Sequence, residues 1–65
     1  MITVLRVDGT ENVLMVCVDY LTGKYCLVNL TNKMIGKARF DTEEEIALSM
    51  QHYKKIGKIK EYIIV

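Results

Sequence analysis

The stretch "YLTGKYC", residues 20 to 26, decides how this chain folds, because it joins two apolar segments through a turn. A Thr-Gly pair between β-rich runs is typical of a hairpin. Cys17 comes shortly before this stretch, and Cys26 is its last residue. The length of the loop between them therefore determines whether the two thiols share a face of the sheet. A slip of one residue in register moves a whole strand to the opposite face.

Two loop lengths are compatible with this stretch. A loop of two residues, Thr22 and Gly23, would put both cysteines on one face. A loop of three residues, beginning at Leu21 and closed by glycine in the left-handed conformation, would put them on opposite faces. The alternation favours three residues, because one face then collects an entirely apolar set: Leu14, Val16, Val18, Cys26, Val28 and Leu30. We therefore expect Cys26 in the core and Cys17 on the other, half-polar face.

Further strands are expected on both sides of this hairpin. Asp8-Gly9 within "VDGT" is a second hairpin signal, and it follows the apolar segment of residues 2 to 7. "MIGKARF", residues 34 to 40, alternates as a half-buried strand does. The terminal "YIIV", residues 62 to 65, is typical of a strand buried on both sides.

"FDTEEEIALSMQHYKKIG", residues 40 to 57, is predicted to form the helix of the fold. Thr42 with Glu45, or Asp41 with Glu44, makes a capping box, and Gly57 supplies the stop. An apolar stripe recurs at helical spacing: Ile46, Met50, Tyr53 and Ile56. We expect one α+β domain over residues 1–65: a small antiparallel sheet of about four to five strands with one helix packed on one face, in the order β-β-β-β-α-β.

The bulk composition restricts the class of protein. With 65 residues, 51% of them hydrophobic and 26% charged, the chain belongs to small folded domains. A net charge of +1 argues against duplex DNA as the partner. No membrane-length apolar stretch and no secretory leader are present, so we expect a cytoplasmic protein with reduced cysteines and no membrane partner.

Residue patterns that support catalysis or metal binding are missing. There is no Cys-x-x-Cys, no histidine pair and no glycine-rich phosphate loop. Cys17 could pair with His52, the sole histidine, but no third group is spaced to orient them. We therefore expect no metal, no cofactor and no enzymatic activity.

One sheet face is expected to act as a binding surface, because it combines apolar side chains with a basic rim. We predict a non-enzymatic binding protein that uses this face, or a free strand edge, to hold a protein partner or a second copy in a homodimer. The residues predicted to contact the partner are Met15, Cys17, Tyr25, Leu27, Lys37 and Arg39.

The segment "YCLVNLTNKMIGKARFDTEEEIALSM", residues 25 to 50, resembles small uncharacterised proteins encoded by phages and prophages of Gram-positive bacteria. The resemblance lies in a strand pair followed by Phe-Asp-Thr and an acidic helix start. It implies a phage accessory protein that works in the host cytoplasm and inhibits or modulates a host protein by binding to it.

Two alternatives remain open at this point. A protein that binds single-stranded nucleic acid would stack bases on Tyr25 and hold the backbone with Lys24, Lys37 and Arg39. A structural subunit of a larger assembly would need no specific site.

Overall fold

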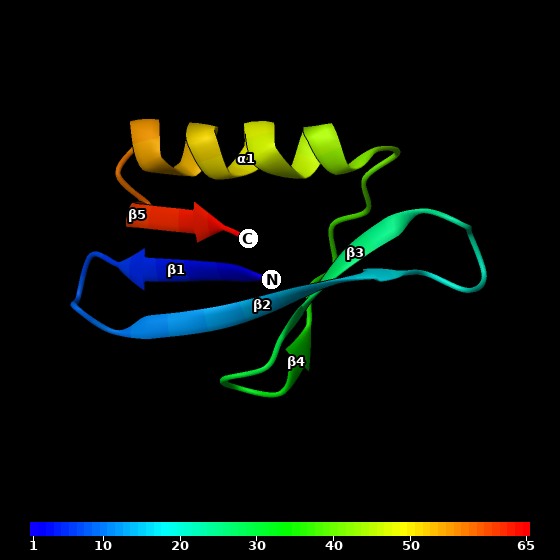
Figure 1. Ribbon diagram of the computed structural model, residues 1–65, viewed down its shortest axis with the longest axis horizontal. Coiled ribbons are helices and arrows are strands. Elements are labelled where there is room, and N and C mark those ends of the chain that lie inside the picture. Colours follow the sequence, from blue (N-terminus) through cyan, green and yellow to red (C-terminus); the bar gives the residue numbers. More distant parts are fainter.

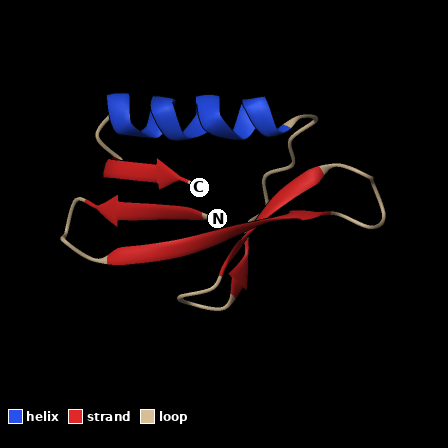
Figure 2. Ribbon diagram, viewed as in Figure 1, coloured by secondary structure: helices blue, strands red, loops and turns tan.

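Five strands and one helix make up the computed structural model, which describes residues 1–65 (Figures 1 and 2). All neighbouring strands are antiparallel, and their order in the sheet is β4-β3-β2-β1-β5. The predicted α+β class and the order of elements are confirmed. The helix is too short and too polar to cross a membrane. The elements are β1 Ile2–Arg6, β2 Glu11–Val18, β3 Tyr25–Asn29, β4 Met34–Ile35, α1 Glu43–Lys55 and β5 Ile59–Ile64.

The first hairpin joins β1 to β2 through three loop residues, Val7 to Gly9. The Arg6 amide donates to the Thr10 carbonyl at 2.8 Å, and Gly9 occupies the left-handed region at φ +90°. The Asp8 carboxylate accepts hydrogen bonds from the Thr10 amide at 2.9 Å and from its hydroxyl at 2.7 Å. A three-residue loop closed by a left-handed glycine matches the right-handed twist of the strands.

The second hairpin has four loop residues, Tyr20 to Gly23, not the predicted three. The Asp19 amide donates to the Lys24 carbonyl at 2.6 Å, and the Gly23 amide donates back to the Asp19 carbonyl at 2.7 Å. The Asp19 carboxylate also accepts from the Leu21 amide at 2.9 Å, which orders the longer loop. As a result Cys17 lies directly opposite Cys26, and the expectation that the two thiols lie on opposite faces is wrong.

The two faces of the sheet follow from this register. The helix face, which α1 partly covers, carries side chains from three central strands: Ile2, Val4, Leu14, Val16, Tyr25 and Leu27. The open face, which no element covers, carries Val13, Met15, Cys17, Cys26, Val28 and Ile35. The predicted face is therefore correct for Leu14 and Val16 on β2 but wrong for Cys26 and Val28 on β3, which belong to the open face. Cys26 is nevertheless buried, as predicted.

The helix begins and ends where the sequence predicts. Thr42 is the N-cap and accepts from the Glu45 amide at 3.3 Å, while the Glu45 carboxylate accepts from the Asp41 amide at 3.1 Å. Of the predicted stripe, Ile46 and Met50 are buried, whereas Tyr53 is half-buried and Ile56 is exposed. The core cluster comprises Ile2, Val4, Phe40, Ile46 and Met50.

Residues 34 to 40 form only part of the predicted strand. After the short β4, the Gly36 amide donates to the Leu27 carbonyl at 2.8 Å, and Phe40 then pairs with Tyr25. Residues 37 to 39 bulge between these two points and lie opposite Cys26. The Arg39 guanidinium closes the bulge by donating to the carbonyls of Gly36 and Ala38.

Strand β5 forms one edge of the sheet, so the prediction that its end is buried on both sides is wrong. Ile63 is 61% exposed and Val65 is 92% exposed. The Tyr62 amide points away from β1, but the Glu61 carboxylate accepts a hydrogen bond from it at 3.1 Å. Lys54 of α1 donates to the same carboxylate at 2.9 Å. This arrangement occupies an edge donor that an incoming strand would otherwise use.

Candidate binding groove

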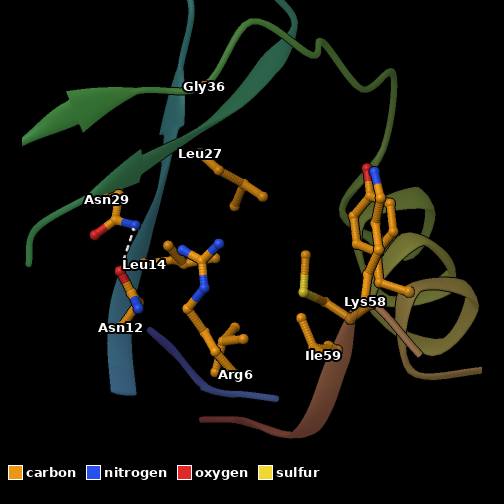
Figure 3. A pocket seen from close by; sticks show the side chains of 11 residues that line it. Arg6, Asn12, Leu14, Leu27, Asn29, Gly36, Lys58 and Ile59 are labelled. Carbon is orange, nitrogen blue, oxygen red and sulfur yellow. Dashed lines mark hydrogen bonds between the residues drawn. The ribbon is translucent and has the colours of Figure 1, made fainter. Parts of the chain in front are cut away.

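A groove opens on the helix face because one short helix cannot cover five strands. Figure 1 shows α1 alongside β5, at the opposite end of the strand order from β4. Between α1 and the strands β2 and β3 lies a cavity of about 470 Å³ (Figure 3). We call it the binding groove; its lining residues are Val4, Arg6, Asn12, Leu14, Leu27, Asn29, Gly36, Met50, Tyr53, Lys58 and Ile59.

The floor of the binding groove is apolar. Its side chains come from five elements that are spread along the sequence: Val4, Leu14, Leu27, Met50 and Ile59. Gly36 lets the chain after β4 run close to β3, since a Cβ there would lie 3.2 Å from the Leu27 carbonyl oxygen. Partly exposed apolar floors of this kind are typical of ligand and peptide sites.

Two cations border this floor, and neither belongs to an ion pair. The three ion pairs of the protein are Lys24 with Asp41, Arg39 with Asp19, and Lys54 with Glu61. Arg6 and Lys58 are absent from this set, and the lining of the binding groove contains no carboxylate. Figure 3 shows the Arg6 side chain extending toward Leu14. The Lys58 Nζ lies 5.4 Å from the centre of the Tyr53 ring, a cation–π distance that holds the ammonium at the helix side.

An amide pair completes the polar part of the lining. Asn29 Nδ2 donates to Asn12 Oδ1 at 2.9 Å (Figure 3). Asn29 Oδ1 accepts from the amides of Thr31 and Asn32. Asn12 is 8% exposed and is the one buried polar residue of the protein. Its Nδ2 group donates to no atom of the chain. No side-chain nitrogen or oxygen of the protein is both inaccessible to solvent and without a hydrogen-bond partner, so this group is open to solvent. Asn12 is therefore a donor that a ligand in the binding groove can use.

The six predicted contact residues do not form one surface. Leu27 lines the binding groove, and Tyr25 packs beside it against the core cluster. Met15 and Cys17 lie on the open face, so the expectation that all six share a face is wrong. Lys37 is exposed on the bulge.

Arg39 is engaged within the protein. Its Nε donates to Asp19 at 2.6 Å, and its Nη1 donates to two backbone carbonyls. The hydrogen bond to Asp19 raises the pKa of Arg39 and lowers that of Asp19. A partner would have to compete with these contacts to reach the guanidinium.

The sequence prediction missed Asn12, Asn29 and Lys58 as site residues. Asn12 did carry a signal, since it is an amide directly before a run of apolar residues, Val13 to Val18, in the same strand. Lys58 carried none, because its place depends on β5 returning beside β1.

Comparisons with protein-family models, with curated proteins and with solved structures give no match. The function is therefore inferred from the binding groove and the sheet faces alone.

Proposed function

We propose that this chain is a non-enzymatic binding protein whose binding groove holds an extended segment of a protein partner, with an apolar side chain on the floor and a carboxylate beside it. The observation that carries the proposal is the pair of unpaired cations, Arg6 and Lys58, above an apolar floor that contains no carboxylate. Charge-assisted hydrogen bonds from Arg or Lys to a carboxylate are among the stronger polar contacts in interfaces.

The binding groove supports this role better than a free strand edge does. The Tyr62 amide at the β5 edge already donates to the Glu61 carboxylate, so a partner strand that pairs with this edge cannot use that amide as a donor. Arg6 and Lys58 form no ion pair, and the Asn12 Nδ2 group donates to no atom of the chain, so all three side chains can donate to a ligand in the binding groove. For a phage accessory protein, the role implied by the resemblance of residues 25 to 50, the segment would belong to a host protein.

The test is a selection of displayed random peptides on the immobilised protein, followed by anisotropy titration of the selected peptides. Peptides that join an acidic residue to a large apolar residue should be enriched. The double variant Arg6→Gln/Lys58→Gln should weaken their binding about tenfold or more, because two charge-assisted contacts are lost.

The matched control is Lys60→Gln, an exposed lysine with no ion pair and no place in the groove lining. It should leave the affinity unchanged. Replacing the acidic residue of the peptide by its amide should reproduce the loss seen with the double variant. Equal affinity of the double variant and the wild type for every selected peptide would reject the groove as the binding site.

A specific observation also favours self-association as a second candidate. Met15, Val28 and Ile35 lie side by side across the open face, and Ile35 is 65% exposed. A row of uncovered apolar side chains is typical of an interface. Sedimentation of the wild type should show a dimer that Met15→Lys weakens, while a monomer at all concentrations would remove this candidate.

The structure offers less for the nucleic-acid alternative. Lys24 and Arg39 are both paired with carboxylates. Tyr25 borders a hollow whose other lining residues are Asp41, Thr42, Glu43 and Glu44. Three carboxylates beside the proposed stacking residue repel a phosphate backbone.

A further inference from the structure

Cys17 and Cys26 are free thiols that lie directly opposite each other on β2 and β3. Backbone bonds join Asp19 to Lys24 and Val13 to Leu30, at even intervals along the same ladder. Because bonded and non-bonded pairs alternate, Cys17 and Cys26 form a hydrogen-bonded pair, with Cα atoms about 5.5 Å apart. This separation lies within the range that disulfides span.

We infer that Cys17 and Cys26 form a reversible intramolecular disulfide on the open face when the protein meets a small disulfide oxidant such as oxidised glutathione. This goes beyond the proposed binding function and does not depend on it, because the binding groove lies on the opposite face of the same strands.

The two thiols differ in solvent accessibility, and this difference determines which of them an oxidant reaches first. Cys17 is half-buried and Cys26 is buried. Residues 37 to 39 bulge opposite Cys26, and Arg39 reaches across to Asp19, on the same face and two residues after Cys17. An oxidant therefore meets Cys17 first.

The exchange proceeds in two balanced steps. The Cys17 thiolate attacks one sulfur of oxidised glutathione, the glutathione S–S bond breaks, and one glutathione thiolate leaves and takes up the proton that Cys17 lost. The Cys26 thiolate then attacks the Cys17 sulfur, and the second glutathione leaves as a thiol with the proton from Cys26. The two cysteine sulfurs are oxidised to a disulfide, and one oxidised glutathione is reduced to two molecules of glutathione.

The pair geometry makes the bridge reversible. Side chains in a hydrogen-bonded pair lie farther apart than in a non-bonded pair, whereas a relaxed disulfide holds its Cβ atoms only about 3.8 Å apart. Closing the bridge therefore strains the ladder. Strained disulfides have higher reduction potentials and are the labile ones.

The experiment equilibrates the folded protein, at low micromolar concentration, with buffers of stepped glutathione to oxidised-glutathione ratio. The samples are then quenched in acid, alkylated and weighed by mass spectrometry. We expect a monomeric species that has lost two hydrogen atoms and accepts no alkyl group, and that returns to the dithiol when the buffer is made reducing. Its Tm should rise by less than a relaxed bridge would give, because strain in the ladder offsets part of the restriction that the bridge places on the unfolded chain.

Single variants separate the two roles. Cys26→Ser should accumulate a stable glutathione adduct on Cys17, whereas Cys17→Ser should stay unmodified until it is unfolded in urea. Circular dichroism confirms that each variant is folded. A wild type that stops at the glutathione adduct, forms only disulfides between chains, or closes the bridge only in urea would overturn the inference.

Discussion

The two hairpin turns carry the same local signature but differ in what fixes them. Each ends in a left-handed glycine, Gly9 at φ +90° and Gly23 at φ +72°, and each contains an aspartate that accepts backbone hydrogen bonds. Asp8 lies inside its three-residue loop and contacts only Thr10 through hydrogen bonds. Asp19 lies before its four-residue loop and also holds Arg39, twenty positions away in the chain.

This difference shows that a glycine marks where a turn ends but not how long the loop is. The first turn is determined by its own residues. The second belongs to a junction in which β2, the loop and the bulge of residues 37 to 39 meet. Because the loop has one residue more than the sequence predicts, the side chains of β3 that face the helix are the opposite set from the predicted one.

The largest expected effect comes from breaking the junction at its buried end. Phe40 follows Arg39 directly and is 8% exposed in the core cluster, so Phe40→Ala should destabilise the fold by about 3 kcal/mol. This is more than half of the roughly 5 kcal/mol expected for so small a domain. Val7→Ala, in the exposed first turn, should stay within about 0.5 kcal/mol. Urea unfolding followed by circular dichroism measures both, and similar losses would contradict the comparison.

The two glycines should be equally necessary. A Cβ at Gly9 or Gly23 would meet no atom within 4 Å, so only the backbone conformation opposes a side chain. Gly9→Ala and Gly23→Ala should each cost about 1 to 2 kcal/mol. The same urea experiment applies, and a clearly smaller loss at Gly23 would show that the longer loop relaxes to accept alanine.

A smaller effect separates the two aspartates by pH and salt. The Thr10 hydroxyl lowers the pKa of Asp8, and the Arg39 guanidinium lowers the pKa of Asp19, both from an ordinary value of 3.8. Each carboxylate therefore stabilises the fold above that value, and its contribution is lost as the pH falls through the lowered pKa of the folded state.

Tm measured from about pH 5 downward should fall in the wild type and fall less in Asp8→Asn and in Asp19→Asn. Sodium chloride at about 1 M should weaken the Asp19 contribution, because its partner is charged, and spare that of Asp8. A salt effect of equal size on both variants would mean that the Arg39 contact adds nothing.

The smallest effect is expected from shortening the second loop. Leu21 is 93% exposed, and its deletion would leave three residues before Lys24, as in the first turn. The free energy of unfolding should change by less than about 1 kcal/mol. The pairing of Val16 with Leu27, read from the NMR contact between their α-protons, should remain. A shift of Val16 to Cys26 would show that loop length alone sets the register.

Local signals in the sequence were enough to predict the helix and both hairpins. Thr42, Glu45 and Gly57 mark the helix ends through contacts within a few residues. The register of β3 could not be predicted, because it depends on Arg39 and Phe40 meeting Asp19 and Tyr25 from a distant segment. The binding groove was missed for the same reason, since Lys58 and Arg6 line one cavity only because β5 returns beside β1.

The Glu61 carboxylate occupies a backbone donor at the β5 edge that cross-β pairing between chains would need. The segment from Tyr62 to Val65 is apolar, uncharged and rich in β-branched residues, the composition that stacks between chains. The hydrogen bond from Lys54 lowers the pKa of Glu61, so the carboxylate that accepts from the Tyr62 amide stays ionised to a lower pH. Acid that protonates Glu61 weakens this bond and opens a template for cross-β pairing, so the protein should be stored and studied well above the pKa of this one side chain.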